Sequence, residues 1–163
     1  MFRGAQKVTL DIKGRMVLPT RVRDELASLG ENRLVVTADR DQHLLVYPLS
    51  DWEALQARLL DLPNLNEETR WLQRLMVGYA TDLDLDGHGR VLLSAELREF
   101  AGIERDAILF GQGDHLELWD EQRWKQASAA AMTAPRSSAP AEQLNSLRLS
   151  AGTRSAPPPD KDK

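Results

Sequence analysis

The 163-residue chain contains no cysteine. Disulfides and thiolate-bound zinc or iron–sulfur sites are therefore excluded, and the cytoplasm is the simplest compartment for such a chain. The sequence also lacks any apolar run near the roughly 20 residues that span a bilayer, and no apolar segment at its start has the form of a secretion signal. We therefore expect a cytoplasmic protein that does not enter a membrane.

Signatures of catalysis and metal binding are missing as well. No serine lies in a G-x-S-x-G turn, and there is no glycine-rich phosphate loop. His43 and His115 could bind a metal only by converging across the fold or between subunits, so we expect them to be hairpin residues at strand entrances. Residues 82–87 imitate the start of a calcium loop, but the acid required at position 12 is replaced by Leu93. We expect no enzyme, no cofactor, no metal and no small-molecule substrate.

The charge of the chain is unevenly distributed. The net charge is −4, which taken alone argues against a nucleic-acid partner. Residues 1–23, however, hold six basic side chains and one acidic one, and the remaining residues hold 15 basic and 24 acidic ones. This basic segment indicates either an electrostatic site for nucleic acid or an ordinary solvated face.

The chain contains a tandem repeat. Residues 11–18 align with residues 86–93 at an offset of 75, and both read D-x-x-G-R followed by three apolar residues. Residues 43–47 align with residues 115–119 at an offset of 72, and a tryptophan follows each histidine by nine residues. The same elements in the same order indicate a duplication.

Each copy predicts two hairpins around a short helix. The expected elements of the first copy are strands 8–11 and 15–18 around a Lys13-Gly14 turn, helix 20–29, and strands 34–37 and 44–47. Those of the second are strands 81–86 and 90–93, a helix from Ser94 to about Ala101, and strands 107–110 and 116–119. Further helices are predicted from a capping box at Ser50 to about Leu60, after Asn66, and over 120–132.

These elements predict an α+β fold, mainly β, with helices around it. Because a half of about 50 residues is small for an independent core, we expect the two repeats to form one closed or nearly closed pseudo-twofold β-barrel. The expected regions are 1–63 (first repeat and its following helix, DNA-binding), 64–78 (linking helix), 79–132 (second repeat and C-terminal helix) and 133–163. The last is rich in alanine, serine and proline, which predicts a flexible tail. Trp52, Trp71, Trp119 and Trp124 are expected in the core or in a subunit interface, with stacking on single-stranded nucleic acid as the alternative.

Motifs spread over roughly residues 1–130 resemble those of the MraZ family. They are Met1-Phe2-Arg3-Gly4, Asp11-x-Lys13-Gly14-Arg15-x-x-x-Pro19, Leu45-Val46-Tyr47-Pro48-Leu49-x-x-Trp52, Gln73-Arg74-Leu75, Asp86-Gly87-x-Gly89-Arg90, Phe110-Gly111-Gln112 and Glu117-Leu118-Trp119-Asp120. The resemblance implies an AbrB-like swapped-hairpin fold and a ring-like homo-oligomer. It also implies a nucleoid-associated transcriptional regulator. Such a protein binds repeated double-stranded DNA sites upstream of the division and cell-wall gene cluster that includes its own gene.

The first D-x-x-G-R turn is the main candidate for DNA contact. Gly14 would allow close approach, and Arg15 could offer two parallel hydrogen bonds to guanine O6 and N7. Lys13, Lys7 and Arg3 would neutralise phosphates. Further candidates are Arg21, His88 and Arg90; the second turn has His88 where the first has Lys13, so it is less basic.

Two alternatives remain open. Asp11 and Arg15, like Asp86 and Arg90, could pair only to fix their turns, although an arginine can do both. The protein could also be an oligomeric interaction scaffold with incidental DNA affinity.

Overall fold

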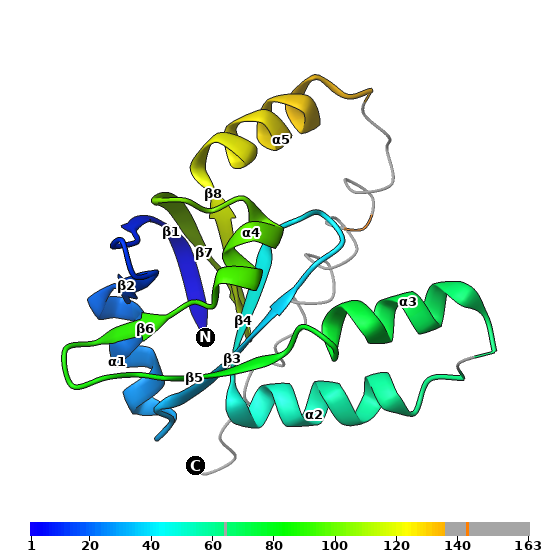
Figure 1. Ribbon diagram of the computed structural model, residues 1–163, viewed down its shortest axis with the longest axis horizontal. Helices are drawn as coiled ribbons and strands as arrows, with labels where there is room; N and C mark the ends of the chain where they lie inside the picture. Colours follow the sequence, from blue (N-terminus) through cyan, green and yellow to red (C-terminus); the bar gives the residue numbers. More distant parts are fainter. Residues whose placement is uncertain (64, 136–142, 144–163) are drawn as a thin grey trace, which may run out of the picture. The chain divides into compact units, whose positions relative to one another are not determined.

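The computed structural model describes residues 1–63, 65–135 and 143 (Figure 1). Residues 1–128 form one compact unit, and residues from 129 onward belong to a second. The strands of the described part are β1 (Phe2–Thr9), β2 (Arg15–Val17), β3 (Arg33–Ala38), β4 (Leu44–Pro48), β5 (Thr81–Asp84), β6 (Arg90–Leu92), β7 (Asp106–Gly113) and β8 (Leu116–Asp120). Its helices are α1 (Thr20–Ser28), α2 (Leu49–Leu60), α3 (Glu67–Met76), α4 (Ala95–Ala101) and α5 (Glu121–Thr133). The α+β class is confirmed. The tail predicted over 133–163 lies outside the described residues, apart from 133–135 and 143.

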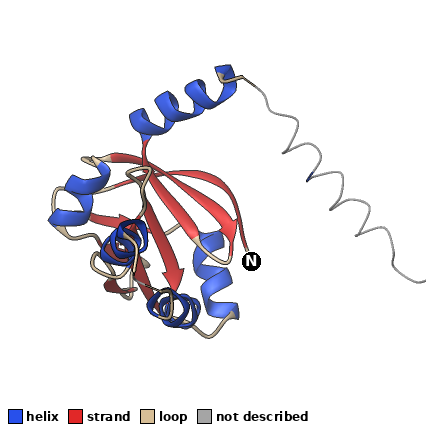
Figure 2. Ribbon diagram, turned by 90° about the vertical axis from the view of Figure 1, so that its right-hand side faces the viewer, coloured by secondary structure: helices blue, strands red, loops and turns tan. Residues whose placement is uncertain are grey.

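The main sheet is open, so the predicted closed barrel is wrong. Its six strands have the order β1-β7-β8-β4-β3-β5, all pairs antiparallel, and Figure 2 shows them as one twisted sheet flanked by helices. The edge strands are β1 and β5. The strands that would have to join these edges, β2 and β6, are three residues long and pair with each other in a separate ribbon. The hairpin expected from strands 8–11 and 15–18 is present only next to its turn, where one isolated β-bridge joins Leu10 and Met16.

Strand pairing crosses between the repeats. β1 of the first repeat pairs with β7 of the second, and β5 of the second pairs with β3 of the first. The two other strand pairings between the repeats in the described part of the chain join equivalent strands, β2 with β6 and β4 with β8. The two copies therefore share one sheet and one core, as expected for halves too small to be stable alone.

One face of the sheet packs against the ribbon and against α1 and α4. Strand alternation directs Leu34 and Val36 to this face, together with Leu44 and Val46, and all four are buried. Met16 of β2 and residues of both helices complete the same cluster. Each fully buried leucine or valine of such a core contributes about 1.5–3 kcal/mol by removal from water.

The opposite face is covered differently in the two repeats. In the first, α2 and α3 lie side by side over β3 and β4, and Trp52 is buried against Tyr47 (Figure 1). In the second, Trp124 of α5 packs on Phe110, with ring centroids 4.3 Å apart. Trp71 is 59% exposed on α3, so the expectation of a core position is wrong for this residue and an interface position stays a prediction.

The histidines of the two repeats stack on aromatic rings across β4 and β8. The ring centroids of His43 and Trp119 lie 4.2 Å apart with the rings nearly parallel, and those of His115 and Tyr47 lie 4.9 Å apart. His43 is buried, and neither of its ring nitrogens has a hydrogen-bond partner in the described part of the chain. Burial therefore lowers the pKa of His43, although Asp39 and Glu117 nearby oppose the shift. Among the described residues no group of acidic or histidine side chains could hold a metal ion.

Most local signals of helix boundaries are confirmed. The side chain of Asn66 accepts a hydrogen bond from Thr69 N at 2.7 Å, Ser94 caps α4, and Gly102 ends α4 in a left-handed conformation. The capping box at Ser50 is wrong: α2 begins at Leu49, directly after Pro48, without a side-chain cap. The ring of Pro48 fixes its φ at −54°, and with Pro48 as N-cap the helix starts two residues earlier than it would with Ser50 as N-cap. Within the described ranges no helix is both long and apolar enough to cross a membrane.

Candidate nucleic-acid interface

The separate two-stranded ribbon carries both copies of the repeated motif. In the antiparallel pair of β2 and β6, Arg15 lies opposite Leu92 and Val17 lies opposite Arg90. The central residues between them, Met16 and Val91, are each 1% exposed and belong to the core. Because successive side chains of a strand point to opposite faces, the outer four lie on the other face of the ribbon, away from that core.

The outer face of the ribbon combines cationic and apolar groups in a twofold pattern. Val17 and Leu92 are exposed, and each lies directly opposite an arginine. The two arginines are therefore diagonal to each other across the ribbon. An antiparallel ribbon of this kind has the width that the major groove of DNA admits.

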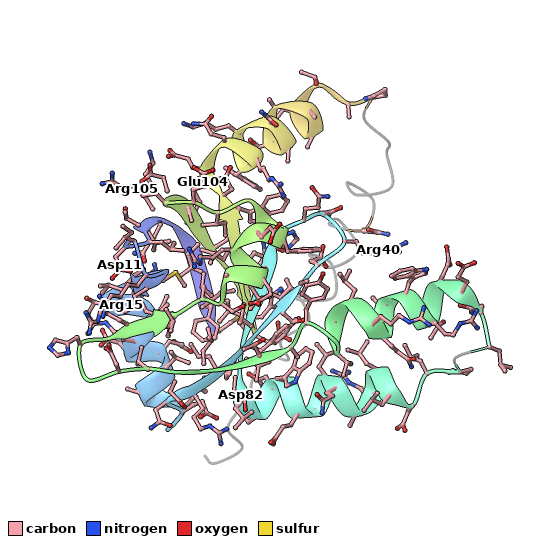
Figure 3. The ribbon with its side chains drawn as sticks, in the orientation of Figure 1. Asp11, Arg15, Arg40, Asp82, Glu104 and Arg105 are labelled. Atoms are coloured by element: carbon pink, nitrogen blue, oxygen red, sulfur yellow. The ribbon has the colours of Figure 1, made fainter. Side chains whose placement is uncertain are left out.

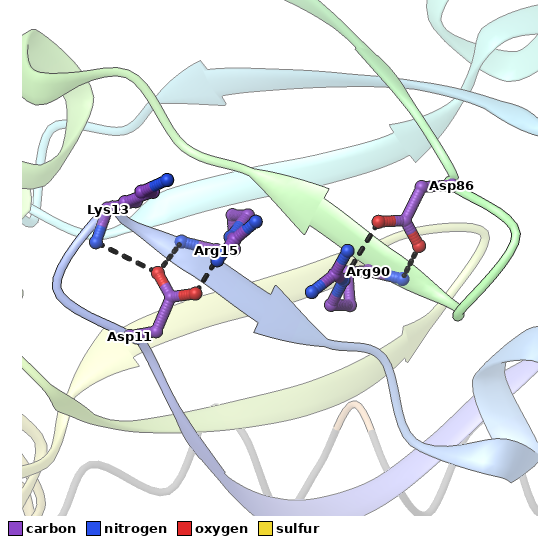
Figure 4. A network of polar contacts seen from close by, with 5 residues as sticks. All are labelled: Asp11, Lys13, Arg15, Asp86 and Arg90. Atoms are coloured by element: carbon purple, nitrogen blue, oxygen red, sulfur yellow. Dashed lines mark hydrogen bonds and ion pairs between the residues drawn. The ribbon is translucent and has the colours of Figure 1, made fainter.

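The first turn is organised by Asp11. Its Oδ1 accepts hydrogen bonds from the backbone N–H groups of Lys13 and Arg15, both at 2.9 Å, and its Oδ2 accepts one from Nε of Arg15 at 2.8 Å (Figure 4). Gly14 N donates to the carbonyl of Asp11 at 2.9 Å. Gly14 has a φ of +85°, a conformation that side chains rarely adopt.

This network orients Arg15 through Nε and does not use the two terminal nitrogens of its guanidinium group. The ion pair engages Nε, and among the described residues neither terminal nitrogen has a partner. These two nitrogens provide the planar pair of donors that matches guanine O6 and N7. The alternative that Arg15 only fixes the turn is therefore not required by the geometry, because the same side chain can do both.

The second turn repeats the first almost atom for atom. Oδ1 of Asp86 accepts from the N–H groups of His88 at 2.8 Å and Arg90 at 2.9 Å. Oδ2 accepts from Nε of Arg90 at 2.8 Å, and Figure 4 shows both hydrogen bonds between Asp86 and Arg90. Gly89 takes the position of Gly14, with a φ of +73°. The sequence duplication is therefore also a duplication of site geometry.

Both turn aspartates are stabilised in the charged form. The backbone N–H of Arg90, followed by its side chain and the N–H of His88, lowers the pKa of Asp86 to about 2. The equivalent donors from Arg15 and Lys13 lower the pKa of Asp11. Both ion pairs consequently persist at neutral pH.

A hollow of about 600 Å³ lies beside the ribbon and brings further charges to it. Arg15, Arg90 and Arg105 line it together with Asp11 and Glu104. Figure 3 shows Arg105 and Glu104 at the same end of the molecule as Asp11 and Arg15. Arg105 is a residue that the sequence reasoning missed; it is one exposed charge in a loop, and no motif marks it.

The remaining candidates of the basic N-terminal segment lie outside the turns, although Lys7 lines a hollow that Val17 of the ribbon also lines. Lys7 donates a 2.6 Å hydrogen bond to Glu121, which raises the pKa of Lys7. Arg3 lies near the start of β1, roughly 20 Å from Thr9 at the other end because a strand advances about 3.3 Å per residue. Arg21 is an exposed residue of α1 whose guanidinium lies near Gly4, also at the start of β1.

The geometry defines a pseudo-twofold, strand-exchanged α+β protein that presents two arginine-bearing turns on one ribbon. The family model described as "MraZ protein, putative antitoxin-like" matches this chain twice, over residues 1–75 and 76–147. The chain belongs to the MraZ family.

Named relatives cover most of the chain. A protein of Thioalkalivibrio sulfidiphilus named "Transcriptional regulator MraZ" is 51% identical over 124 residues, which cover 76% of this chain and 83% of the relative. Proteins of the same name from Pseudomonas aeruginosa and Pseudomonas putida are 50% and 51% identical over 135 residues. Each of these alignments covers 82% of this chain and 89% of the relative.

Proposed function

We propose that this protein is a sequence-specific regulator of transcription that binds double-stranded DNA through the β2–β6 ribbon. One observation carries the proposal: Arg15 is fixed by Asp11 through Nε, while within the part of the chain that the structure describes its terminal nitrogens have no partner on the outer face of the ribbon. Such preorganisation lowers the entropy lost on binding. The printed names of the relatives support the same class of function.

In this proposal the first turn is the principal contact. Arg15 hydrogen-bonds a guanine edge in the major groove, and Gly14 allows the backbone to approach. Lys13 binds a neighbouring phosphate, with Lys7 and Arg3 as more distant phosphate contacts along the first repeat. Arg21, His88 and Arg90 are further contacts, the last two through the equivalent second turn. The DNA-binding region is 1–63; 64–78 links it to the second repeat at 79–132, and 133–163 is a tail.

Several copies of the chain would act together. We propose a ring-like homo-oligomer whose turns engage successive copies of a short repeated site, so that weak contacts combine through a high effective concentration. The exchange of strands between repeats supports assignment to the AbrB-like swapped-hairpin superfamily. The target we propose is the DNA upstream of the division and cell-wall gene cluster that contains the protein's own gene. The protein would act in the cytoplasm at the nucleoid, without cofactor, substrate or catalysis.

Fluorescence anisotropy with a labelled DNA fragment tests the proposal. The fragment is the sequence upstream of the protein's own gene, compared with a scrambled one across a salt series. Wild type, Arg15→Ala and Arg33→Ala are measured. Arg33 is a matched control, because it is also an exposed, ion-paired arginine but lies on β3, paired with Asp82. Loss of a bidentate base contact of about 1–3 kcal/mol weakens binding roughly 5- to 150-fold per site.

We expect tight binding to the native fragment, a strong loss with Arg15→Ala and little change with Arg33→Ala. Equal and weak binding to both fragments, unaffected by Arg15→Ala, would refute the proposal. The scaffold alternative would then be favoured, since it requires only charge-driven affinity that is indifferent to sequence.

A further inference from the structure

An arginine from each repeat packs on the turn of the other repeat. A Cβ placed on Gly14 would lie 2.7 Å from Nε of Arg98, and one placed on Gly89 would lie 2.7 Å from Cδ of Arg23. Arg98 belongs to α4 of the second repeat and Arg23 to α1 of the first. Each guanidinium side chain thus occupies the space that the missing glycine side chain leaves.

The backbone makes the same crosswise connection. Leu93 N, just before α4, donates to the carbonyl of Gly14 at 3.0 Å. Leu18 N, just before α1, donates to the carbonyl of Gly89 at 2.9 Å. Each turn is therefore bound on one side by its own aspartate and on the other by the chain segment and arginine of the opposite repeat.

We propose that Arg98 and Arg23 are positioning residues, each of which holds the DNA-contacting turn of the opposite repeat in its binding conformation. The inference rests on the proposed function for its consequence in DNA affinity. The physical basis is that the hydrogen bonds to the aspartate close each turn locally but do not fix it against the rest of the fold, so an exposed turn held only by them would open more readily. Packing a planar side chain across the glycine removes the space into which the turn would move.

The two arginines differ in the hydrogen bonds that their side chains make. Nε of Arg23 donates to the carbonyl of Leu18 at 3.0 Å, and its terminal nitrogen donates to Oγ1 of Thr20 at 3.0 Å. Nε of Arg98 is buried and has no hydrogen-bond partner in the described chain. Arg98 is consequently retained by its packing on Gly14 rather than by a hydrogen bond from Nε, so its removal affects the first turn more than it affects the fold.

Hydrogen exchange of the free protein tests the positioning directly. In Arg98→Ala we expect the amides of Gly14 and Arg15 to exchange at least tenfold faster, while those of Gly89 and Arg90 keep their wild-type rates. Arg23→Ala should give the reverse pattern. Acceleration at the turn of the same repeat, or at neither turn, would overturn the proposal.

DNA binding then tests the consequence with a double-mutant cycle. We expect Arg98→Ala to weaken binding about five- to tenfold, with no further loss when it is added to Arg15→Ala, because both changes act through one turn. The salt dependence of binding should stay unchanged. If Arg98 contacted a phosphate itself, the slope of log K against log salt would fall by about 0.9 and the losses would be additive. Either result would overturn a purely positioning role.

Arg98→Lys separates shape from charge. Lysine keeps the positive charge but not the planar group that covers the glycine. We expect Arg98→Lys to behave like Arg98→Ala in both measurements, and full rescue would overturn the proposal. A wild-type protein that fails to bind the native fragment would refute the proposed function, whereas the exchange pattern decides the crosswise packing independently of DNA.

Discussion

Replacement of Gly14 by alanine would test how closely the first turn is packed. A Cβ at this position would lie 2.9 Å from the carbonyl oxygen of Leu93 as well as 2.7 Å from Arg98, and the φ of +85° is unfavourable for any side chain. The left-handed conformation costs about 1–2 kcal/mol for alanine. Overpacking against a backbone atom adds about 1–3 kcal/mol, because a carbonyl cannot move aside as a flexible side chain does.

Gly30 offers a matched control. It also has a positive φ, of +68°, but a Cβ there would have no heavy atom within 4 Å. Gly30→Ala therefore costs only the conformational part, about 1–2 kcal/mol, whereas Gly14→Ala costs about 2–5 kcal/mol. For a unit of this size each kcal/mol lowers Tm by about 4 °C.

Thermal and urea denaturation of the two variants give the comparison. We expect Tm to fall by about 8–20 °C for Gly14→Ala and by about 4–8 °C for Gly30→Ala. Gly14→Ala should also weaken DNA binding, and Gly30→Ala should not. Equal losses of stability in the two variants would refute the close approach at Gly14, since the conformational cost is common to both.

Three further outcomes follow from the structure. Because burial lowers the pKa of His43, the unfolded chain binds a proton more readily than the folded one, and stability decreases as the pH falls below about 6.5. His43→Phe keeps the stacking on Trp119 and should reduce the pH dependence of the free energy of unfolding, measured by urea denaturation between pH 7 and 5. An unchanged pH dependence would contradict this. Asp86, with a pKa of about 2, stabilises the fold above its unfolded pKa of about 3.9, and this contribution is lost as the pH falls toward 2. Asp86→Asn should therefore lower Tm at pH 6 but not at pH 2, and an equal deficit at both would argue against the ion pair. Asn66→Ala should lower the free energy of unfolding by about 1 kcal/mol through loss of the cap, and no change would mean that α3 does not need it.

The sequence predicted what depends on local pattern. Alternating apolar residues, glycines and capping side chains such as Ser94 gave the order of elements in both repeats, and the recurring D-x-x-G-R gave the two turns. These features depend on residues close together in the chain, so one sequence suffices to predict them.

Pairing partners could not be predicted in the same way. The alternation around Val8 predicts a strand, but it carries no information on whether that strand pairs with β2 or with β7. The predicted barrel was wrong for this reason: it was inferred from the small size of each half, which does not reveal that β2 and β6 pair with each other in a separate ribbon.

The candidate site remains a prediction, and the two arginines that pack on its turns were missed. Arg23 and Arg98 stand at the same place in their repeats, five residues after Leu18 and Leu93, so the duplication contained a signal. What each arginine contacts depends on the crossing of the repeats in space, which the spacing does not reveal. The predicted phosphate contacts of Arg3 and Lys7 remain predictions.

The exchange of strands also determines when the protein can fold during synthesis. β1 leaves the ribosome before the other strands of the sheet, yet its partner β7 spans Asp106–Gly113. At the other edge of the sheet, β3 pairs with β5, which also belongs to the second repeat. The first repeat therefore emerges with β1 unpaired, with one edge of the β3–β4 hairpin open and with part of its core exposed, and it gains its remaining partners only when most of the chain has been translated. A ribosome that stalls between the repeats would release an incomplete, aggregation-prone sheet rather than half of a functional protein.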